Sequence, residues 1–155
     1  MKKVVLIILF LISITSVCNA QEKSIDLNWQ TDFAKAKKNA ESKNKLILIY
    51  FTGSDWSKPC KLLNKDFFYT TKFKTIADKN FILVRVNSPR RPGLISDLQE
   101  DKNLALRKSY QQKIFPSVII TDANGKMIGK IESYNYLHDT SKHYNLLNKV
   151  IKNNL

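Results

Sequence analysis

The spacing of hydrophobic and polar positions changes along the chain, and each change predicts a different element. Trp29, Phe33, Ala36 and Ala40 recur at helical spacing with lysines between them, which predicts an amphipathic first helix. The run over 46–51, Leu-Ile-Leu-Ile-Tyr-Phe, is almost continuously apolar. A strand that is buried on both faces has this pattern. The chain therefore opens its folded part with a helix that leads into a central strand.

The same alternation of helix and strand repeats twice. A second helical region is predicted over about 59–77, with a break near 70–71, and a branched-rich strand follows over 81–86. A third helix, marked by apolar positions over 104–110, leads to a strand over 117–121. Parallel strands need such crossover helices between them.

The last third of the chain predicts a hairpin and a closing helix. The turn Asp-Ala-Asn-Gly over 122–125 leads to a returning strand over 127–131, because Asn-Gly supplies the positive φ angles of tight turns. Apolar residues at helical spacing over 144–151 predict the closing helix, capped from within 139–141. We therefore predict an α/β fold with a central mixed sheet of four or five strands and helices on both faces.

Residues 1–20 have the pattern of an export signal. Two lysines precede an apolar run over 4–14 that is too short to span a membrane, and small residues precede the expected cleavage after Ala20. We expect one folded domain over 21–155, located in the periplasm or secreted. An uncleaved anchor and a lipidated Cys18 are the alternatives.

The chain is strongly basic. It has 26 Lys and Arg against 13 Asp and Glu, and removal of the two signal lysines leaves 24 against 13, a net charge of +11. This charge favours anionic partners such as an envelope surface or an acidic protein, whereas nucleic acid is not expected for an exported protein. The lysines are spread along the chain, so a solvated basic surface is the simpler interpretation. The same holds for Arg90 and Arg91 in a proline-containing loop.

Cysteine usage restricts the possible chemistry further. Loss of the signal removes Cys18 and leaves Cys60, so no intramolecular disulfide is expected. An unpaired cysteine in an oxidising compartment is either buried and inert or pairs with another molecule. Cys60, His138 and His143 lack the spacing of metal ligands, and we expect neither a metal nor a cofactor.

Three phrases in order resemble the thioredoxin-like superfamily, in particular exported members with Asp-Trp-Cys-x-x-Cys. They are Phe-Thr-Gly-Ser-Asp-Trp over 51–56, Ile-Phe-Pro-Ser-Val-Ile-Ile over 114–120 and Asp-Ala-Asn-Gly-Lys-Met over 122–127. The resemblance covers roughly 29–151 and implies a thioredoxin-like fold for the domain over 21–155.

The resemblance also implies a site. Pro116 should follow a cis peptide bond and face Cys60, and backbone beside this proline should pair with an extended substrate peptide. Trp56, Phe115 and Pro116 would line a small apolar groove. The alternative is that the two aromatic side chains only pack, which is the simpler interpretation for Phe115.

Two catalytic positions depart from the family pattern. Ser57 stands where the nucleophilic cysteine is expected, and Cys60 matches the resolving cysteine. A serine needs a general base to act as a nucleophile, so we expect Ser57 to cap the helix instead. Tyr50 replaces the buried carboxylate that relays a proton, and tyrosine, with a pKa near 10, is a poor substitute. Gln112 replaces an apolar residue.

These observations leave three functions open. The first is a thioredoxin-like protein, impaired in dithiol exchange at Ser57-Lys58-Pro59-Cys60, that binds partner polypeptides or thiol-containing proteins near Pro116. The second is an active monothiol redox protein that uses Cys60. The third is a basic envelope-binding module without catalysis, whose binding should weaken as salt screens it.

Overall fold

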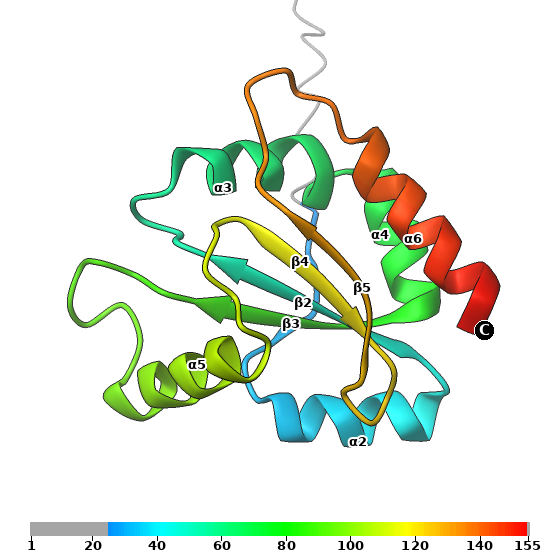
Figure 1. The fold of residues 1–155 in the computed structure, drawn as a ribbon, viewed down its shortest axis with the longest axis horizontal. Helices are drawn as coiled ribbons and strands as arrows, with labels where there is room; N and C mark the ends of the chain where they lie inside the picture. The colour runs from blue at the N-terminus through cyan, green and yellow to red at the C-terminus, as the bar shows by residue number, and fades with distance from the viewer. Residues whose placement is uncertain (1–24, 155) are drawn as a thin grey trace, which may run out of the picture.

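A mixed five-stranded sheet lies at the centre of the computed structural model, which describes residues 25–154 (Figure 1). The strand order is β1-β3-β2-β4-β5, with β1 and β2 parallel to β3 and with β4 antiparallel to both β2 and β5. The strands are β1 (Trp29–Gln30), β2 (Leu46–Thr52), β3 (Phe81–Asn87), β4 (Ser117–Thr121) and β5 (Met127–Glu132). The predicted mixed sheet is confirmed. The predicted export signal lies outside the described residues.

Helices cover both faces of this sheet, as predicted. In Figure 1, α2 and α5 lie below the sheet, and α3, α4 and α6 lie above it. Their bounds are α2 (Phe33–Lys43), α3 (Lys58–Leu63), the π-helical turn η1 (Asn64–Phe68), α4 (Thr71–Asn80), α5 (Asp97–Ser109) and α6 (Ser141–Asn154). Within residues 25–154, none of these helices combines the length and the apolar character that crossing a membrane requires.

The central strand β2 divides the hydrophobic core into two. Leu48 and Tyr50 face the layer built from α3, η1, α4 and α6, whereas Ile49 and Phe51 face the layer built from α2 and α5. All seven residues of β2 are buried. Successive side chains of a strand point to opposite faces, so a strand covered on both sides needs apolar residues at every position.

The prediction that Trp29 belongs to the first helix is wrong. The helix begins at Phe33, because the side chain of Asp32 accepts a hydrogen bond from the Lys35 N–H at 3.0 Å and acts as the N-cap. Trp29 lies in β1 and packs edge-on against Phe68, with ring centroids 5.3 Å apart. Its helical spacing from later apolar residues was coincidental.

The predicted helical region over 59–77 is two helices joined by η1. The expected break near 70–71 is confirmed, because Thr70 caps α4 by accepting a hydrogen bond from the Phe73 N–H at 3.2 Å. The predicted hairpin also forms, with Gly125 at φ +93° in the turn between β4 and β5.

The sheet brings two distant segments of the chain to one edge. Phe51, near the end of β2, pairs with Ser117, the first residue of β4. The loop that follows β2 and the residues that precede β4 therefore lie at the same end of the sheet. These segments contain the first two of the three phrases identified in the sequence, over 51–56 and 114–120.

Candidate functional site

An aromatic pair joins these two segments. The rings of Trp56 and Phe115 meet edge to face with centroids 5.6 Å apart. The Trp56 Nε1 donates a hydrogen bond to the Ser88 carbonyl oxygen at 2.9 Å, which fixes the indole. A Cβ at Gly53 would lie 2.4 Å from the indole, so a side chain at this position would displace the ring. Both aromatic side chains remain half-buried.

Ser57 and Cys60 occupy the first turn of α3. The Ser57 Oγ accepts a hydrogen bond from the Cys60 N–H at 3.4 Å, and Pro59 occupies the first turn, where its missing N–H costs little. The capping role predicted for Ser57 is confirmed. Ser57 is 4% exposed and Cys60 is 0% exposed, and within residues 25–154 its thiol has no disulfide partner. The arrangement offers neither a surface thiol nor an activated hydroxyl.

Tyr50 lies beneath this turn. Its hydroxyl donates a hydrogen bond to the Cys60 carbonyl oxygen at 3.2 Å, and its ring packs against Phe68 with centroids 4.4 Å apart. Burial, reinforced by the nearby Cys60, raises the pKa of Tyr50 above its ordinary value. The side chain is therefore neutral at physiological pH and cannot accept the proton that a carboxylate would take.

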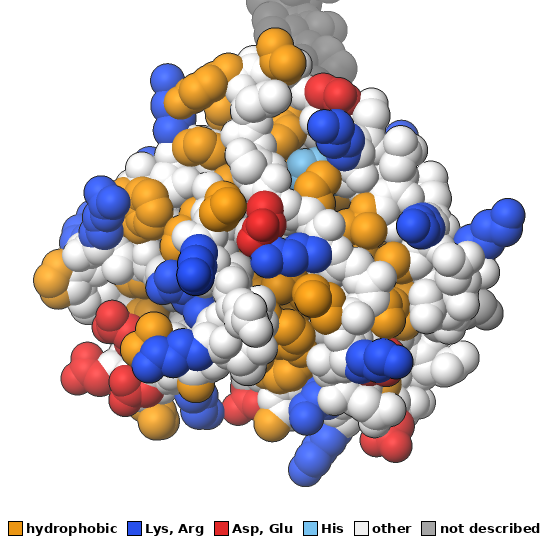
Figure 2. All heavy atoms as spheres, viewed as in Figure 1, with side chains coloured by type: hydrophobic (Ala, Val, Ile, Leu, Met, Phe, Trp, Pro, Cys, Tyr) orange, Lys and Arg blue, Asp and Glu red, His pale blue; other side chains and the backbone are white. Residues whose placement is uncertain are grey.

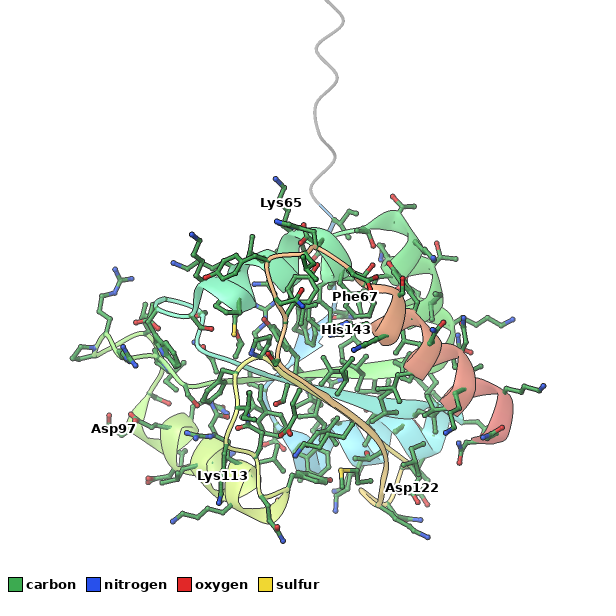
Figure 3. The ribbon with its side chains drawn as sticks, turned by 45° about the horizontal axis from the view of Figure 1, so that its top comes forward. Lys65, Phe67, Asp97, Lys113, Asp122 and His143 are labelled. Atoms are coloured by element: carbon green, nitrogen blue, oxygen red, sulfur yellow. The ribbon has the colours of Figure 1, made fainter. Side chains whose placement is uncertain are left out.

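Both histidines make contacts that hold them in other parts of the structure. The His138 Nδ1 lies 2.5 Å from the Asp66 Oδ2, which also accepts a hydrogen bond from the Tyr134 hydroxyl at 2.8 Å. His143 packs against Phe67 with ring centroids 5.1 Å apart (Figure 3), and burial lowers its pKa to about 4. Among residues 25–154, no three His, Cys, Asp or Glu side chains gather as a metal site.

The proline segment presents unpaired backbone. The Phe115–Pro116 peptide bond is cis, and the Pro116 carbonyl oxygen accepts a hydrogen bond from the Ser133 N–H at 2.8 Å. In the part of the chain that the structure describes, neither the N–H nor the C=O of Phe115 takes part in a hydrogen bond. Such free main-chain groups are what an added extended strand would pair with.

Two arginines next to the aromatic pair were not predicted as site residues. The Arg90 guanidinium lies over the Trp56 ring, 4.1 Å from its centroid, and the Arg107 guanidinium lies over the Phe115 ring at 4.8 Å. Sequence reasoning placed Arg90 in a solvated loop and did not single out Arg107. The sequence feature that could have pointed to Arg107 was Gln112, a polar residue where the family resemblance implies an apolar one.

Basic side chains on the visible face do not gather in one place. Figure 2 shows Lys and Arg spread over the visible face, with a group of Asp and Glu at its lower left, over the start of α5. The first turn of α5 carries Asp97 and Glu100, and its last turn carries Arg107 and Lys108. On the face shown, Lys and Arg therefore form no single basic patch.

Comparison with known proteins gives relatives in thiol-disulfide chemistry. The disulfide bond reductase DsbH of Chlamydia pneumoniae is 28% identical over 106 residues, which cover 68% of this chain and 63% of the relative. The thioredoxin-related protein DsbJ of the same organism is 23% identical over 133 residues, covering 85% of this chain and 38% of the relative. The chain thus spans less than two thirds of the length of these curated relatives.

Solved structures agree in fold. A DsbH oxidoreductase structure superposes with a TM-score of 0.69 at 26% identity, covering 81% of this chain and 87% of the other. A thioredoxin from Thermus thermophilus, at 12% identity and a TM-score of 0.64 over 82% and 88% of the two chains, shares the fold alone. A sequence model described as thioredoxin-like matches residues 28–123, more than half of the chain. This protein belongs to the thioredoxin-like family and has the thioredoxin-like α/β fold.

Proposed function

We propose that this protein is an exported thioredoxin-like protein that binds partner polypeptides, including thiol-containing proteins, in the groove beside Pro116. We further propose that it is impaired in dithiol exchange. Its similarity to a disulfide bond reductase supports a role related to thiol-disulfide chemistry.

The observation that carries the proposal is that the motif at the start of α3 has a capping serine and a buried cysteine. Thiol-disulfide exchange needs an accessible thiolate, and a second thiol to resolve the mixed disulfide. Ser57 fills the first position as a buried cap, and Cys60 has no exposed surface. A chain with this motif keeps the fold on which the exchange takes place but lacks the sulfur atom that would attack the disulfide first.

The groove supports the binding part of the proposal. Trp56 and Phe115 provide a half-buried aromatic wall, and the main-chain groups of Phe115 are unpaired within the described residues. An extended polypeptide can add to such an edge through its backbone, while its side chains contact the aromatic pair. Recognition of this kind does not require the missing thiol.

A monothiol activity of Cys60 is the second candidate, supported by the homology to a reductase. In this case the Cys60 thiolate attacks a partner disulfide, one partner sulfur leaves as a thiol, and a mixed disulfide remains. The reaction requires local opening of the first turn of α3, because the thiol is fully covered.

Two assays test the proposal. In a model disulfide reduction assay with dithiothreitol, the wild-type protein should add nothing to the uncatalysed rate. Turnover that disappears in Cys60→Ser would establish the monothiol alternative. In calorimetry with a thiol-free extended peptide, Trp56→Ala should weaken binding about tenfold. The matched control Tyr69→Ala, which removes a 45% exposed aromatic side chain elsewhere, should not.

Export is tested separately. Expression of the full chain in a Gram-negative bacterium, followed by cell fractionation and mass spectrometry, should give a periplasmic or secreted protein that begins at Gln21. A cytoplasmic protein that retains residues 1–20 would contradict this part of the proposal.

A further inference from the structure

The aromatic pair of the groove also forms part of a cavity. A hollow of about 240 Å³ lies between the loops after β2 and β3, residues 100–107 of α5 and the segment before β4. Its lining includes Trp56, Arg90, Glu100, Asn103, Arg107 and Phe115. The volume suits one side chain of a partner, and Arg90 and Arg107 give the cavity two positively charged hydrogen-bond donors.

Arg90 is held at one side of the cavity. Its guanidinium stacks over Trp56, and its backbone N–H donates hydrogen bonds to both carboxylate oxygens of Asp55, at 3.2 and 3.1 Å. The same carboxylate accepts the Arg91 N–H at 2.9 Å. The Asp55 carboxylate therefore holds the loop by its backbone N–H groups. The Arg90 guanidinium stays free to bind another anion.

Arg107 is held at the other side. Its guanidinium stacks over Phe115, and its Nε donates a hydrogen bond to the Gln112 Oε1 at 3.3 Å. Gln112 is buried, and its Nε2 is in turn anchored by the Ser117 Oγ at 3.2 Å. This chain of contacts gives the polar residue at position 112 a role, because Gln112 holds Arg107 in the lining of the cavity.

Neither guanidinium has an anionic partner in the part of the chain that the structure describes. Within residues 25–154, no carboxylate lies within ion-pair distance of Arg90 or Arg107. A second hollow of about 370 Å³ shares Arg107 and adds Lys108 and Lys113. Of the residues that line the two hollows, Glu100 alone is acidic. Lys113 lies in the segment between α5 and β4, and Asp97 is the first residue of α5 (Figure 3).

We propose that the cavity between Arg90 and Arg107 selects partner polypeptides that carry an Asp or Glu side chain, and that these two arginines bind its carboxylate. This proposal rests on the polypeptide binding proposed above. A planar guanidinium donates paired hydrogen bonds to a carboxylate, and stacking on an aromatic ring restricts its orientation in advance. A concave site for a single side chain favours a polypeptide over a flat anionic membrane.

The test uses capped, thiol-free extended peptides of nine residues, measured by calorimetry at low salt. One glutamate is moved through each position in turn, and the reference peptide has glutamine there instead. Wild-type protein should bind the glutamate peptide about tenfold more tightly at one or two positions. Arg107→Gln and Arg90→Gln should each remove most of this preference. Glu100→Gln should increase it about twofold, because it removes the opposing charge.

Lys79→Gln is the matched control. It removes one positive charge from α4, on the other face of the sheet, and should leave the preference unchanged. Equal affinity for the glutamate and glutamine peptides at every position would overturn the carboxylate proposal while leaving polypeptide binding intact. If Lys79→Gln also lost the preference for the glutamate peptide, the preference would be an effect of net charge, and the proposal would be overturned. Absence of binding by both peptides would overturn polypeptide binding as well.

A membrane arm completes the test. Vesicles with anionic lipid are titrated against wild-type protein and Arg107→Gln under the same conditions. We expect weaker binding than to the glutamate peptide. Vesicle binding that exceeds peptide binding, and that Arg107→Gln abolishes, would assign the two arginines to a lipid surface and overturn the proposal.

Discussion

Replacement of Ser57 by cysteine should create a reducible disulfide with Cys60. The two residues lie one helical turn apart, and the Ser57 Oγ already points back to within 3.4 Å of the Cys60 nitrogen. The substitution exchanges one oxygen for sulfur in a position that is almost fully buried. It supplies the thiol that the motif lacks without altering the surrounding core.

The expected energies are modest and of opposite sign. Loss of the cap should destabilise the reduced variant by about 0.5–1 kcal/mol, because cysteine is a weak acceptor and the existing hydrogen bond is long. Closing a four-residue loop should stabilise the oxidised form by roughly 2 kcal/mol relative to the reduced form. For a domain of this size, the oxidised variant should therefore melt roughly 6–10 °C above the reduced variant.

The assay combines thiol titration after mild oxidation with thermal unfolding of both redox forms. Ser57→Ala is the control for loss of the cap, and it should match the reduced cysteine variant. Two thiols that stay free under oxidant in the folded protein would refute the reasoning. In that case Cys60 is not placed as a resolving cysteine, even though the fold is that of the family.

Three further predictions concern the surroundings of the motif. Gly53→Ala should lower stability by about 1–3 kcal/mol and shift tryptophan fluorescence, because its Cβ would meet the Trp56 indole at 2.4 Å; an unchanged spectrum would contradict this. In a Ser57→Cys background, Tyr50→Phe should leave the disulfide exchange rate within twofold, because the raised pKa of Tyr50 prevents proton relay; a tenfold loss would show a relay. His143 has its pKa lowered by burial from 6.5 to about 4, so the neutral form stabilises the fold above pH 6.5 and the stability falls progressively toward pH 4. His143→Phe should reduce the loss of unfolding free energy between pH 7 and 4.5, measured in urea, by about 2–3 kcal/mol; parallel curves would refute it.

Much of the fold could be read from local patterns. The apolar run of β2 predicted a strand covered on both faces, and Asn124-Gly125 predicted the hairpin. Trp29 was predicted in the first helix but lies in β1. Its helical spacing could not reveal that its side chain packs against Phe68, a contact between distant parts of the chain. The start of α2 depended on the cap at Asp32, a single hydrogen bond that periodicity does not encode.

The sequence by itself determined the class of fold and the family, and it put Ser57 three residues before Cys60, where the resemblance implies a cysteine. Only the tertiary structure decided that Cys60 is fully covered and that Arg90 and Arg107 stack on the aromatic pair. Exposure and stacking depend on contacts between elements far apart in the chain. A local sequence pattern cannot specify those contacts, because they form only when the sheet brings the segments to one edge.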